Sequence, residues 1–137
     1  MKLPHESYQR VYYEDTDSSG FVYHTSYLKF SERARSEMLS EFFPDVVKSL
    51  KMNTFFFVVK SLEINFVKPS QLFDKLRVLT YYVDNSITSL KLKHVIFLKE
   101  QIICQILVKL VWINGNKKKP VRMPKNIISR FKSFEIV

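Results

Sequence analysis

One segment decides the fold of this chain: Gln9-Arg10-Val11-Tyr12-Tyr13-Glu14-Asp15-Thr16-Asp17-Ser18-Ser19-Gly20-Phe21-Val22-Tyr23-His24-Thr25-Ser26-Tyr27-Leu28. A short β-rich run at residues 7–13 leads into it, and residues 14–20 are a cluster of turn formers that predicts a loop. This loop is acidic although the protein is basic. From about residue 23 the apolar spacing becomes helical, so the segment predicts a strand, an acidic loop and the start of a helix.

The helical pattern extends over about residues 23–41. Apolar side chains recur there every three or four positions, with charged and polar residues between them. The apolar positions are Tyr27, Phe30, Ala34, Met38 and Phe42. This spacing predicts one long amphipathic helix, with Thr25 or Ser26 at the position where a side chain would cap its N-terminus.

The rest of the chain has the alternating pattern of strands. Leu62, Ile64 and Phe66 alternate with polar residues before Pro69. Further strands are predicted at residues 76–83, 89–98 and 102–113, separated by turns short enough for antiparallel hairpins. Pro124 begins a short C-terminal helix. The element order predicts an α+β fold, in which one helix covers one face of a five-stranded antiparallel sheet.

Composition limits the class of protein further. The chain has 137 residues, of which 46% are hydrophobic, and it contains no repeat or linker, so one domain over residues 1–137 is predicted. Its 22 basic and 13 acidic residues give a net charge of +9, which attracts anions. One cysteine and dispersed histidines exclude an internal disulfide and the spacing of a zinc site, and favour a cytoplasmic protein. Neither a signal peptide nor a membrane-spanning run of roughly 20 apolar residues is predicted.

An acidic loop next to a helix N-terminus favours chemistry on a carbonyl group. Unpaired backbone N–H groups at the start of a helix can polarise a carbonyl oxygen. A carboxylate just upstream can attack that carbonyl or activate a water molecule beside it. Gly20 would let the chain adopt a conformation that a Cβ atom disfavours. An Asx-rich turn that only caps the helix is the alternative interpretation.

The YbgC branch of the 4-hydroxybenzoyl-CoA thioesterase family has a signature that resembles two runs in this chain: Asp15-Thr16-Asp17-x-x-Gly20-x-Val22-Tyr23-His24-x-x-Tyr27-Leu28 and Phe30-x-Glu32-Arg33-x-Arg35. The resemblance implies the hotdog fold, in which an antiparallel sheet wraps around one long helix, and a homo-oligomer, either a dimer or a tetramer. It also implies hydrolysis of acyl-CoA to a free acid and coenzyme A, without a metal or another cofactor.

The same resemblance implies roles for particular residues. Asp17 is expected to be the catalytic carboxylate, as a nucleophile or as a general base, and the backbone N–H at about His24 to polarise the thioester carbonyl. The side chain of His24 could orient the water, protonate the departing thiolate or only hydrogen-bond the loop. Substrate contacts are expected from Gly20, Val22, Tyr23 and Tyr27.

Coenzyme A would give the positive charge a partner, because lysines bind phosphates by charge and hydrogen bonds. Lys68, Lys91 and Lys93 are the predicted ligands, and a solvated charge is the alternative for each. Acyl carrier protein, which is acidic, is an alternative carrier of the acyl group. A non-catalytic module that binds anionic lipid or nucleic acid is the rival from another class, although nucleic acid is not expected and membrane contact would be at most peripheral.

Other residues with chemical potential are assigned structural roles. His94 is predicted to be a hydrogen-bonded core or interface histidine, and Cys104 a small core side chain. Glu63 and Asn65 belong to the strand expected beside the long helix, so one of them could enter the active site of a partner subunit. The aromatic run at residues 55–57 fits either an acyl tunnel or a core.

Overall fold

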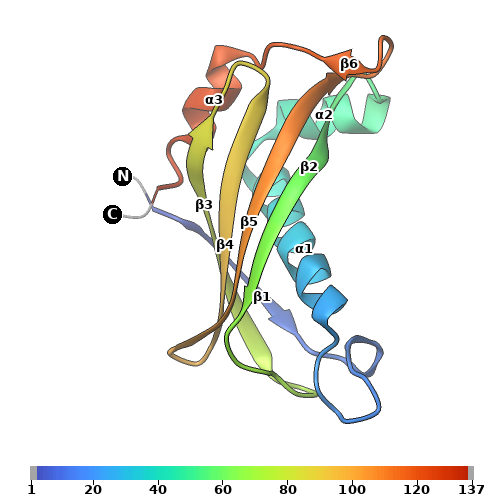
Figure 1. Cartoon of the computed structure of the whole chain (residues 1–137). Coiled ribbons are helices and arrows are strands. Elements are labelled where there is room, and N and C mark those ends of the chain that lie inside the picture. Colours follow the sequence, from blue (N-terminus) through green and yellow to red (C-terminus); the bar gives the residue numbers. More distant parts are fainter. Residues whose placement is uncertain (1–2, 136–137) are drawn as a thin grey trace.

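The computed structural model describes residues 3–135, and its elements follow the predicted order (Figure 1). β1 (His5–Arg10) leads through one turn of 3-10 helix, η1 (Tyr13–Asp15), to the long helix α1 (His24–Phe42). A second helix, α2 (Pro44–Met52), precedes β2 (Phe55–Phe66). The elements that follow are β3 (Lys75–Asn85), β4 (Ser89–Leu98), β5 (Gln101–Asn114), β6 (Lys119–Pro120) and α3 (Lys125–Phe131). The predicted domain of residues 1–137 extends beyond the described residues at both ends.

The strands form one antiparallel sheet in the order β1-β3-β4-β5-β2, and β6 pairs with the end of β5. The sheet curls around α1, which lies against its concave face (Figure 1). The predicted α+β arrangement of an antiparallel sheet around one long helix is therefore confirmed. β6 adds a short sixth strand to the five predicted, because the turn after Asn114 brings the chain back beside β5.

The first strand has different bounds from those predicted, because it begins at His5 and ends at Arg10 instead of reaching residue 13. The backbone N–H of Tyr12 donates a hydrogen bond at 2.9 Å to the carboxylate of Asp15. This bond folds the chain into η1, so residues 12–15 leave the direction of the strand.

The long helix agrees with the prediction in its extent but not in its cap. Its N-cap residue is Tyr23, and neither Thr25 nor Ser26 caps it, because no side chain makes a capping hydrogen bond. Among residues 3–135, no helix is both long and apolar enough to cross a membrane.

Two apolar clusters fill the space between α1 and the sheet. One includes Met38 and Leu92, and the other, nearer the acidic loop, includes Phe30 and Ile96. His94 lies between Leu92 and Ile96 on the inward face of β4, and it is fully buried and hydrogen-bonded, as predicted. The core is therefore divided by a polar layer at the middle of α1.

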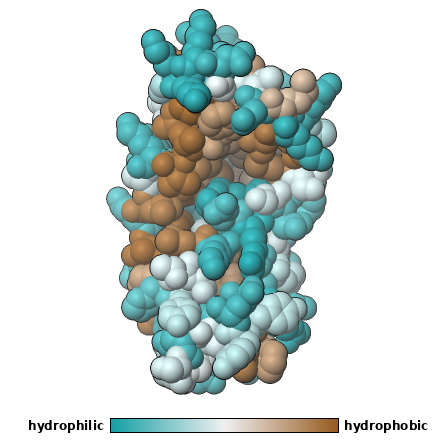
Figure 2. All heavy atoms as spheres, turned by 90° about the vertical axis from the view of Figure 1, so that its right-hand side faces the viewer, coloured by the Kyte–Doolittle hydropathy of each residue, from teal (hydrophilic) through white to brown (hydrophobic). Residues whose placement is uncertain are grey.

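β2 is an exposed edge strand. Val59, Leu62 and Phe66 pair with inward-facing residues of β5 and therefore face the same side as α1. Their side chains are nevertheless exposed, at 48%, 41% and 43%. Figure 2 looks onto this side of the molecule and shows apolar side chains gathered in a stripe beside polar ones. A long apolar edge is a ready template for pairing with another chain.

Candidate active site

The acidic loop is held in a closed conformation by its own backbone. Asp17 donates its N–H to the carbonyl of Phe21 at 2.9 Å, and Gly20 donates to the carbonyl of Asp17 at 3.1 Å. Gly20 has a φ of +85°, a left-handed conformation that favours glycine. The N–H of Val22 bonds the carbonyl of Ser70 at 3.0 Å, which ties the loop to the segment after β2. These bonds fix Asp17 close to the start of α1.

The carboxylate of Asp17 is held by Ser19. Its Oδ1 atom accepts a hydrogen bond from the Ser19 hydroxyl and another from the Ser19 backbone N–H at 2.8 Å. These two bonds hold the pKa of Asp17 below its ordinary value, with a smaller contribution from nearby His24. The sequence analysis did not include Ser19, although a hydroxyl residue two positions after an aspartate is the signal for such a turn.

The start of α1 has free backbone donors. The carbonyl of Asp15 accepts hydrogen bonds from the Tyr23 N–H at 2.9 Å and from the Ser26 hydroxyl at 3.2 Å, so Ser26 is engaged away from the helix end. Among the described residues, the N–H groups of His24 and Thr25 have no acceptor. Unpaired N–H groups at a helix N-terminus form a site for an oxyanion.

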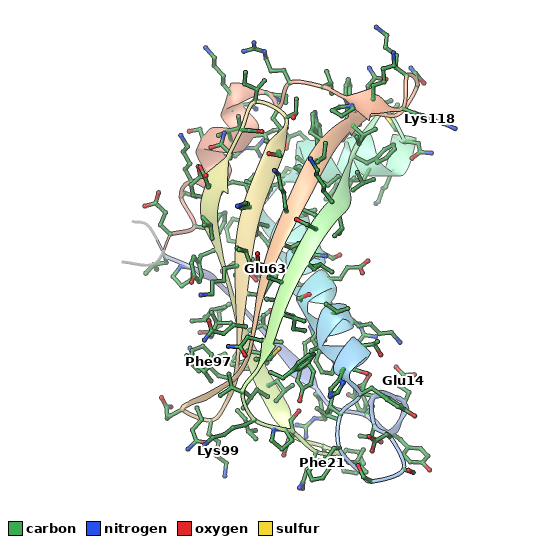
Figure 3. All side chains as sticks on the ribbon, in the orientation of Figure 1. Glu14, Phe21, Glu63, Phe97, Lys99 and Lys118 are labelled. Carbon is green, nitrogen blue, oxygen red and sulfur yellow. The ribbon has the colours of Figure 1, made fainter. Side chains whose placement is uncertain are left out.

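A pocket of about 390 Å³ opens beside these donors and brings together five of the predicted site residues. The five are Asp17, Val22, His24, Tyr27 and Lys68. The other lining residues are Ser19, Phe21, Phe66, Val67 and Pro69. Gly20 and Tyr23 are neighbours in the chain but do not line the pocket. Figure 3 shows Phe21 and Glu14 at this end of the molecule.

Aromatic side chains form one wall of the pocket. The ring centroid of His24 lies 4.7 Å from that of Phe66, and the ring of Tyr27 lies 5.8 Å from the same phenylalanine. The Tyr27 hydroxyl lies 2.7 Å from the hydroxyl oxygen of Ser70, and burial raises the pKa of Tyr27. The role of Ser70 has no local signal in the sequence, because pairing of distant segments brings it to α1.

The three lysines predicted to bind phosphate lie in two places. Lys68 lines the pocket, and its Nζ atom donates a hydrogen bond to the side chain of Gln101 at 3.0 Å. Lys91 and Lys93 alternate with inward-facing residues of β4 and so lie on the face of the sheet that is turned away from α1. Within one chain, these two lysines therefore do not join the Asp17 pocket. Lys118, in the basic run at residues 117–119, lies at the opposite end of the molecule (Figure 3).

Other predicted residues also lie away from this pocket. Phe55 and Phe57 pack against Trp112, with ring centroids 5.8 Å and 4.8 Å away, so these two aromatic residues fill the core. Glu63 and Asn65 line a separate hollow of about 490 Å³ together with Lys93.

The described residues contain no group of three or more His, Cys, Asp or Glu side chains that could hold a metal ion. Cys104 is buried and free. Burial raises its pKa to about 12, so it is a neutral thiol within the core, as predicted.

Comparison with known proteins agrees with the chemistry that this pocket allows. The family model of the thioesterase-like superfamily matches residues 11–131, a range that contains the whole pocket. This chain belongs to the thioesterase-like superfamily. It is a thioester hydrolase, as predicted.

Relatives place this superfamily member near the YbgC proteins. The acyl-CoA thioester hydrolase YbgC of Escherichia coli is 36% identical over 124 residues, which span 90% of this chain and 92% of that protein. The acyl-CoA thioesterase YbgC of Haemophilus influenzae is 34% identical over 122 residues, spanning 89% and 90%. The crystal structure of a probable thioesterase from Bartonella henselae has a TM-score of 0.80 at 34% identity, over 89% of this chain and 100% of that one. The resemblance to the YbgC branch and the hotdog fold are confirmed.

Proposed function

We propose that this thioester hydrolase cleaves acyl-CoA to a free acid and coenzyme A. Two of its relatives are named for activity on acyl-CoA. The observation that carries the proposal is the presence, in one pocket, of the Asp17 carboxylate and the unpaired N–H groups at the start of α1. Thioester hydrolysis needs both, because one group must deliver or activate an oxygen nucleophile while the others stabilise the oxyanion.

In the proposed reaction, the thioester carbonyl oxygen lies over the N–H groups of His24 and Thr25. These donors and the helix dipole stabilise the negative charge that develops on this oxygen. Asp17 acts by one of two routes. As a nucleophile, it attacks the carbonyl carbon and expels the coenzyme A thiolate, and water then hydrolyses the mixed anhydride. As a general base, it takes a proton from a water molecule that attacks the same carbon.

The proposed role of the His24 side chain is to assist departure of the thiolate. His24 is exposed, lines the pocket and packs at a tilted angle against Phe66, which holds its ring at the pocket wall. A histidine there can donate a proton to the leaving sulfur. Orienting the water and hydrogen-bonding the loop are the two other roles considered for this side chain.

The proposed substrate contacts are made by residues that line the pocket or lie next to it. Val22 and Tyr27 would contact the acyl group, while Gly20 shapes the loop and Tyr23 stands at the rim, 49% exposed. Lys68 would bind a phosphate of coenzyme A by charge. Lys91 and Lys93 would take part only if coenzyme A also reached the outer face of the sheet. The chemistry requires no metal or other cofactor, and the reaction is proposed to take place in the cytoplasm.

The proposed active form is a homodimer joined along β2. The support is the 12-residue length of this edge strand and the exposure of its apolar side chains toward the α1 side. A second β2 would continue the sheet and cover these side chains. Acyl carrier protein remains the alternative source of the acyl group, which the positive net charge would favour.

Thiol release from short, long and aromatic acyl-CoAs tests the proposal. The wild type should hydrolyse at least one of them, and Asp17→Asn should lose several orders of magnitude in kcat while still binding substrate. Asp84→Asn is the matched control, because Asp84 is an exposed carboxylate outside the pocket. Failure to cleave any acyl-CoA, or an Asp17→Asn variant as active as Asp84→Asn, would refute it.

A further inference from the structure

The Arg35 guanidinium, in the middle of α1, is partly buried and forms no ion pair with a described carboxylate. Burial lowers the pKa of Arg35, and the charge of Glu32, one turn earlier on the helix, raises it only in part. The Nη1 atom of Arg35 donates a hydrogen bond to Nε2 of His94 at 3.1 Å. None of the ion pairs among residues 3–135 includes Arg35. Removing a guanidinium charge from part of its water is costly when the nearest carboxylate forms no ion pair with it, so the site favours a further anion.

His94 holds the guanidinium in place without neutralising it. Because arginine carries only donors, Nε2 of His94 must accept, and its Nδ1 therefore carries the proton. Nδ1 lies 2.8 Å from the hydroxyl of Thr80, which is also fully buried. Burial and the Arg35 charge keep the pKa of His94 well below its ordinary value, so the imidazole stays neutral. No other hydrogen bond engages the Arg35 side chain among the described residues.

Arg35 is aligned with the active-site pocket along α1. It follows His24 by eleven residues, which is close to three full turns, so both lie on the same side of the helix about 16.5 Å apart. Leu28 lies between them on this side and packs in the same cluster as Ile64 of β2. The side of β2 that faces α1 is apolar and exposed at Val59, Leu62 and Phe66. Figure 2 shows apolar side chains gathered on this side of the molecule. An acyl chain that starts at the pocket therefore has an apolar surface leading toward Arg35, and in the proposed homodimer it would run between this surface and the second copy.

The surroundings of Arg35 strengthen its attraction for an anion. A small cavity of about 10 Å³ at its side chain is lined otherwise only by apolar residues. These are Met38, Leu39, Phe57, Leu92, Leu110 and Phe131. This cavity is smaller than a carboxylate group, so an anion would reach the guanidinium fork from the partly exposed side of Arg35. There a carboxylate can pair with the fork through two parallel hydrogen bonds.

We propose that Arg35, oriented by His94, binds a carboxylate at the far end of the acyl chain, so that the enzyme acts on acyl-CoAs derived from dicarboxylic acids. This inference rests on the proposed function, because it names the substrate class of the same pocket. The Arg35 side chain leans toward the N-terminus of α1 and shortens the span to be bridged, which favours chains of medium length.

A length series on the wild-type protein tests the inference without any variant. Suberoyl-, sebacoyl- and dodecanedioyl-CoA are compared with octanoyl-, decanoyl- and dodecanoyl-CoA, which match them in length. At one length, kcat/KM should be roughly tenfold or more higher for the dicarboxylic substrate, as expected for a hydrogen-bonded charge pair. Cleavage of the monocarboxylic substrates with no such preference at any length would overturn the inference and leave the proposed function intact.

Variants then assign the preference to Arg35. Arg35→Met should abolish it, and Arg35→Lys should retain part of it, because lysine keeps the charge but loses the fork. Arg33→Met is the matched control, since Arg33 is an exposed arginine on the same helix, and it should leave the preference unchanged. If Arg35→Met instead lowers kcat/KM equally for dicarboxylic and monocarboxylic substrates and dissociates an oligomer, the partner of Arg35 is a carboxylate of a second copy. The inference is then wrong.

Product binding gives a readout that does not depend on turnover. Calorimetry should show dodecanedioate binding the wild type more tightly than dodecanoate, and Arg35→Met should remove this difference. If no acyl-CoA is cleaved yet the difference is present, the proposed function fails while the carboxylate site stands. If dodecanedioate and dodecanoate bind the wild type equally, the proposed carboxylate site at Arg35 is wrong as well.

Discussion

The hydroxyl of Ser19 donates a hydrogen bond to Oδ1 of Asp17, and the Ser19 backbone N–H donates a second one to the same oxygen. No described residue donates a side-chain hydrogen bond to the other carboxylate oxygen of Asp17. Ser19 therefore keeps the carboxylate ionised to a lower pH, and the other oxygen is available to act on a substrate or a water molecule. This arrangement makes Ser19 a positioning residue, and its effect has a measurable pH signature.

Ser19→Ala should move the acidic limb of the kcat/KM profile to higher pH. The active form is the ionised carboxylate, and the hydrogen bonds from Ser19 lower the pKa of Asp17, so the wild type stays active to a lower pH. Removing the hydroxyl removes the largest cause of this shift, and activity is then lost earlier as the pH falls. Ser18→Ala is the control, and an acidic limb that does not move would contradict the assigned role of Asp17.

Folding stability should fall as the pH drops below about 6.5, the ordinary pKa of histidine. His94 has a lowered pKa in the folded protein because of its burial and the Arg35 charge, so below this pH the unfolded chain binds a proton that the folded protein does not. One such group costs about 1.4 kcal/mol of unfolding free energy per pH unit. Urea denaturation between neutral pH and the range where carboxylates titrate measures the slope.

Two variants separate His94 from other titrating groups. His94→Gln should unfold with a shallower pH dependence over the same range, although its stability at neutral pH is lower because the Arg35 and Thr80 contacts are disturbed. His24→Gln is the matched control, since it replaces an exposed histidine outside the core. Equal slopes for His94→Gln and the wild type would show that another group titrates.

The sequence predicted the parts of the site that are local in the chain. Asp17, Gly20 and His24 lie within eight positions, and turn formers followed by helical spacing are enough to place a carboxylate beside a helix start. Phe66 lines the same pocket from about forty residues away, and Ser70, equally distant in the chain, contacts the hydroxyl of Tyr27 in its wall. Their positions depend on the pairing of β2 with β5 and on the bond between the acidic loop and Ser70, for which one sequence contains no local signal.

The lysines illustrate a conflict between two sequence arguments. The alternation of apolar and charged residues along β4 predicts that Lys91 and Lys93 lie on its outward face, where the structure places them. Charge alone suggested that they bind the substrate, but the pocket lies at the start of α1, which covers the inward face. Lys68 joins the pocket because β2 ends beside α1, a consequence of tertiary structure.

The two glycines should respond differently to alanine, because each is required for a different reason. Gly20 has open space around it but a left-handed φ, so Gly20→Ala should lower the free energy of unfolding by only about 1 kcal/mol. Its main effect should be a loss of activity, because the loop that carries Asp17 shifts. A Cβ atom at Gly115 would collide with the backbone carbonyl of Asn53. Gly115→Ala should therefore lower the free energy of unfolding by more, about 1–3 kcal/mol. Urea denaturation and kcat/KM on both variants check this order, and the opposite ranking of stabilities would refute it.

Leu62→Lys should convert the proposed homodimer to a monomer. Leu62 lies on the inward side of the edge strand β2 and is 41% exposed, so its side chain would be covered by a second copy. A lysine there would have to lose its hydration at the interface, whereas in a monomer it stays in water. Sedimentation velocity measures the mass directly.

Val83→Lys is the matched control, because Val83 is 43% exposed but belongs to β3, away from this edge. Both variants add one charge at a similarly exposed apolar position, so a difference between them reports on the β2 edge and not on surface charge. If Leu62→Lys also lowers kcat/KM while Val83→Lys does not, the second copy contributes to the site beside α1. A wild type that sediments as an active monomer would show instead that β2 needs no partner.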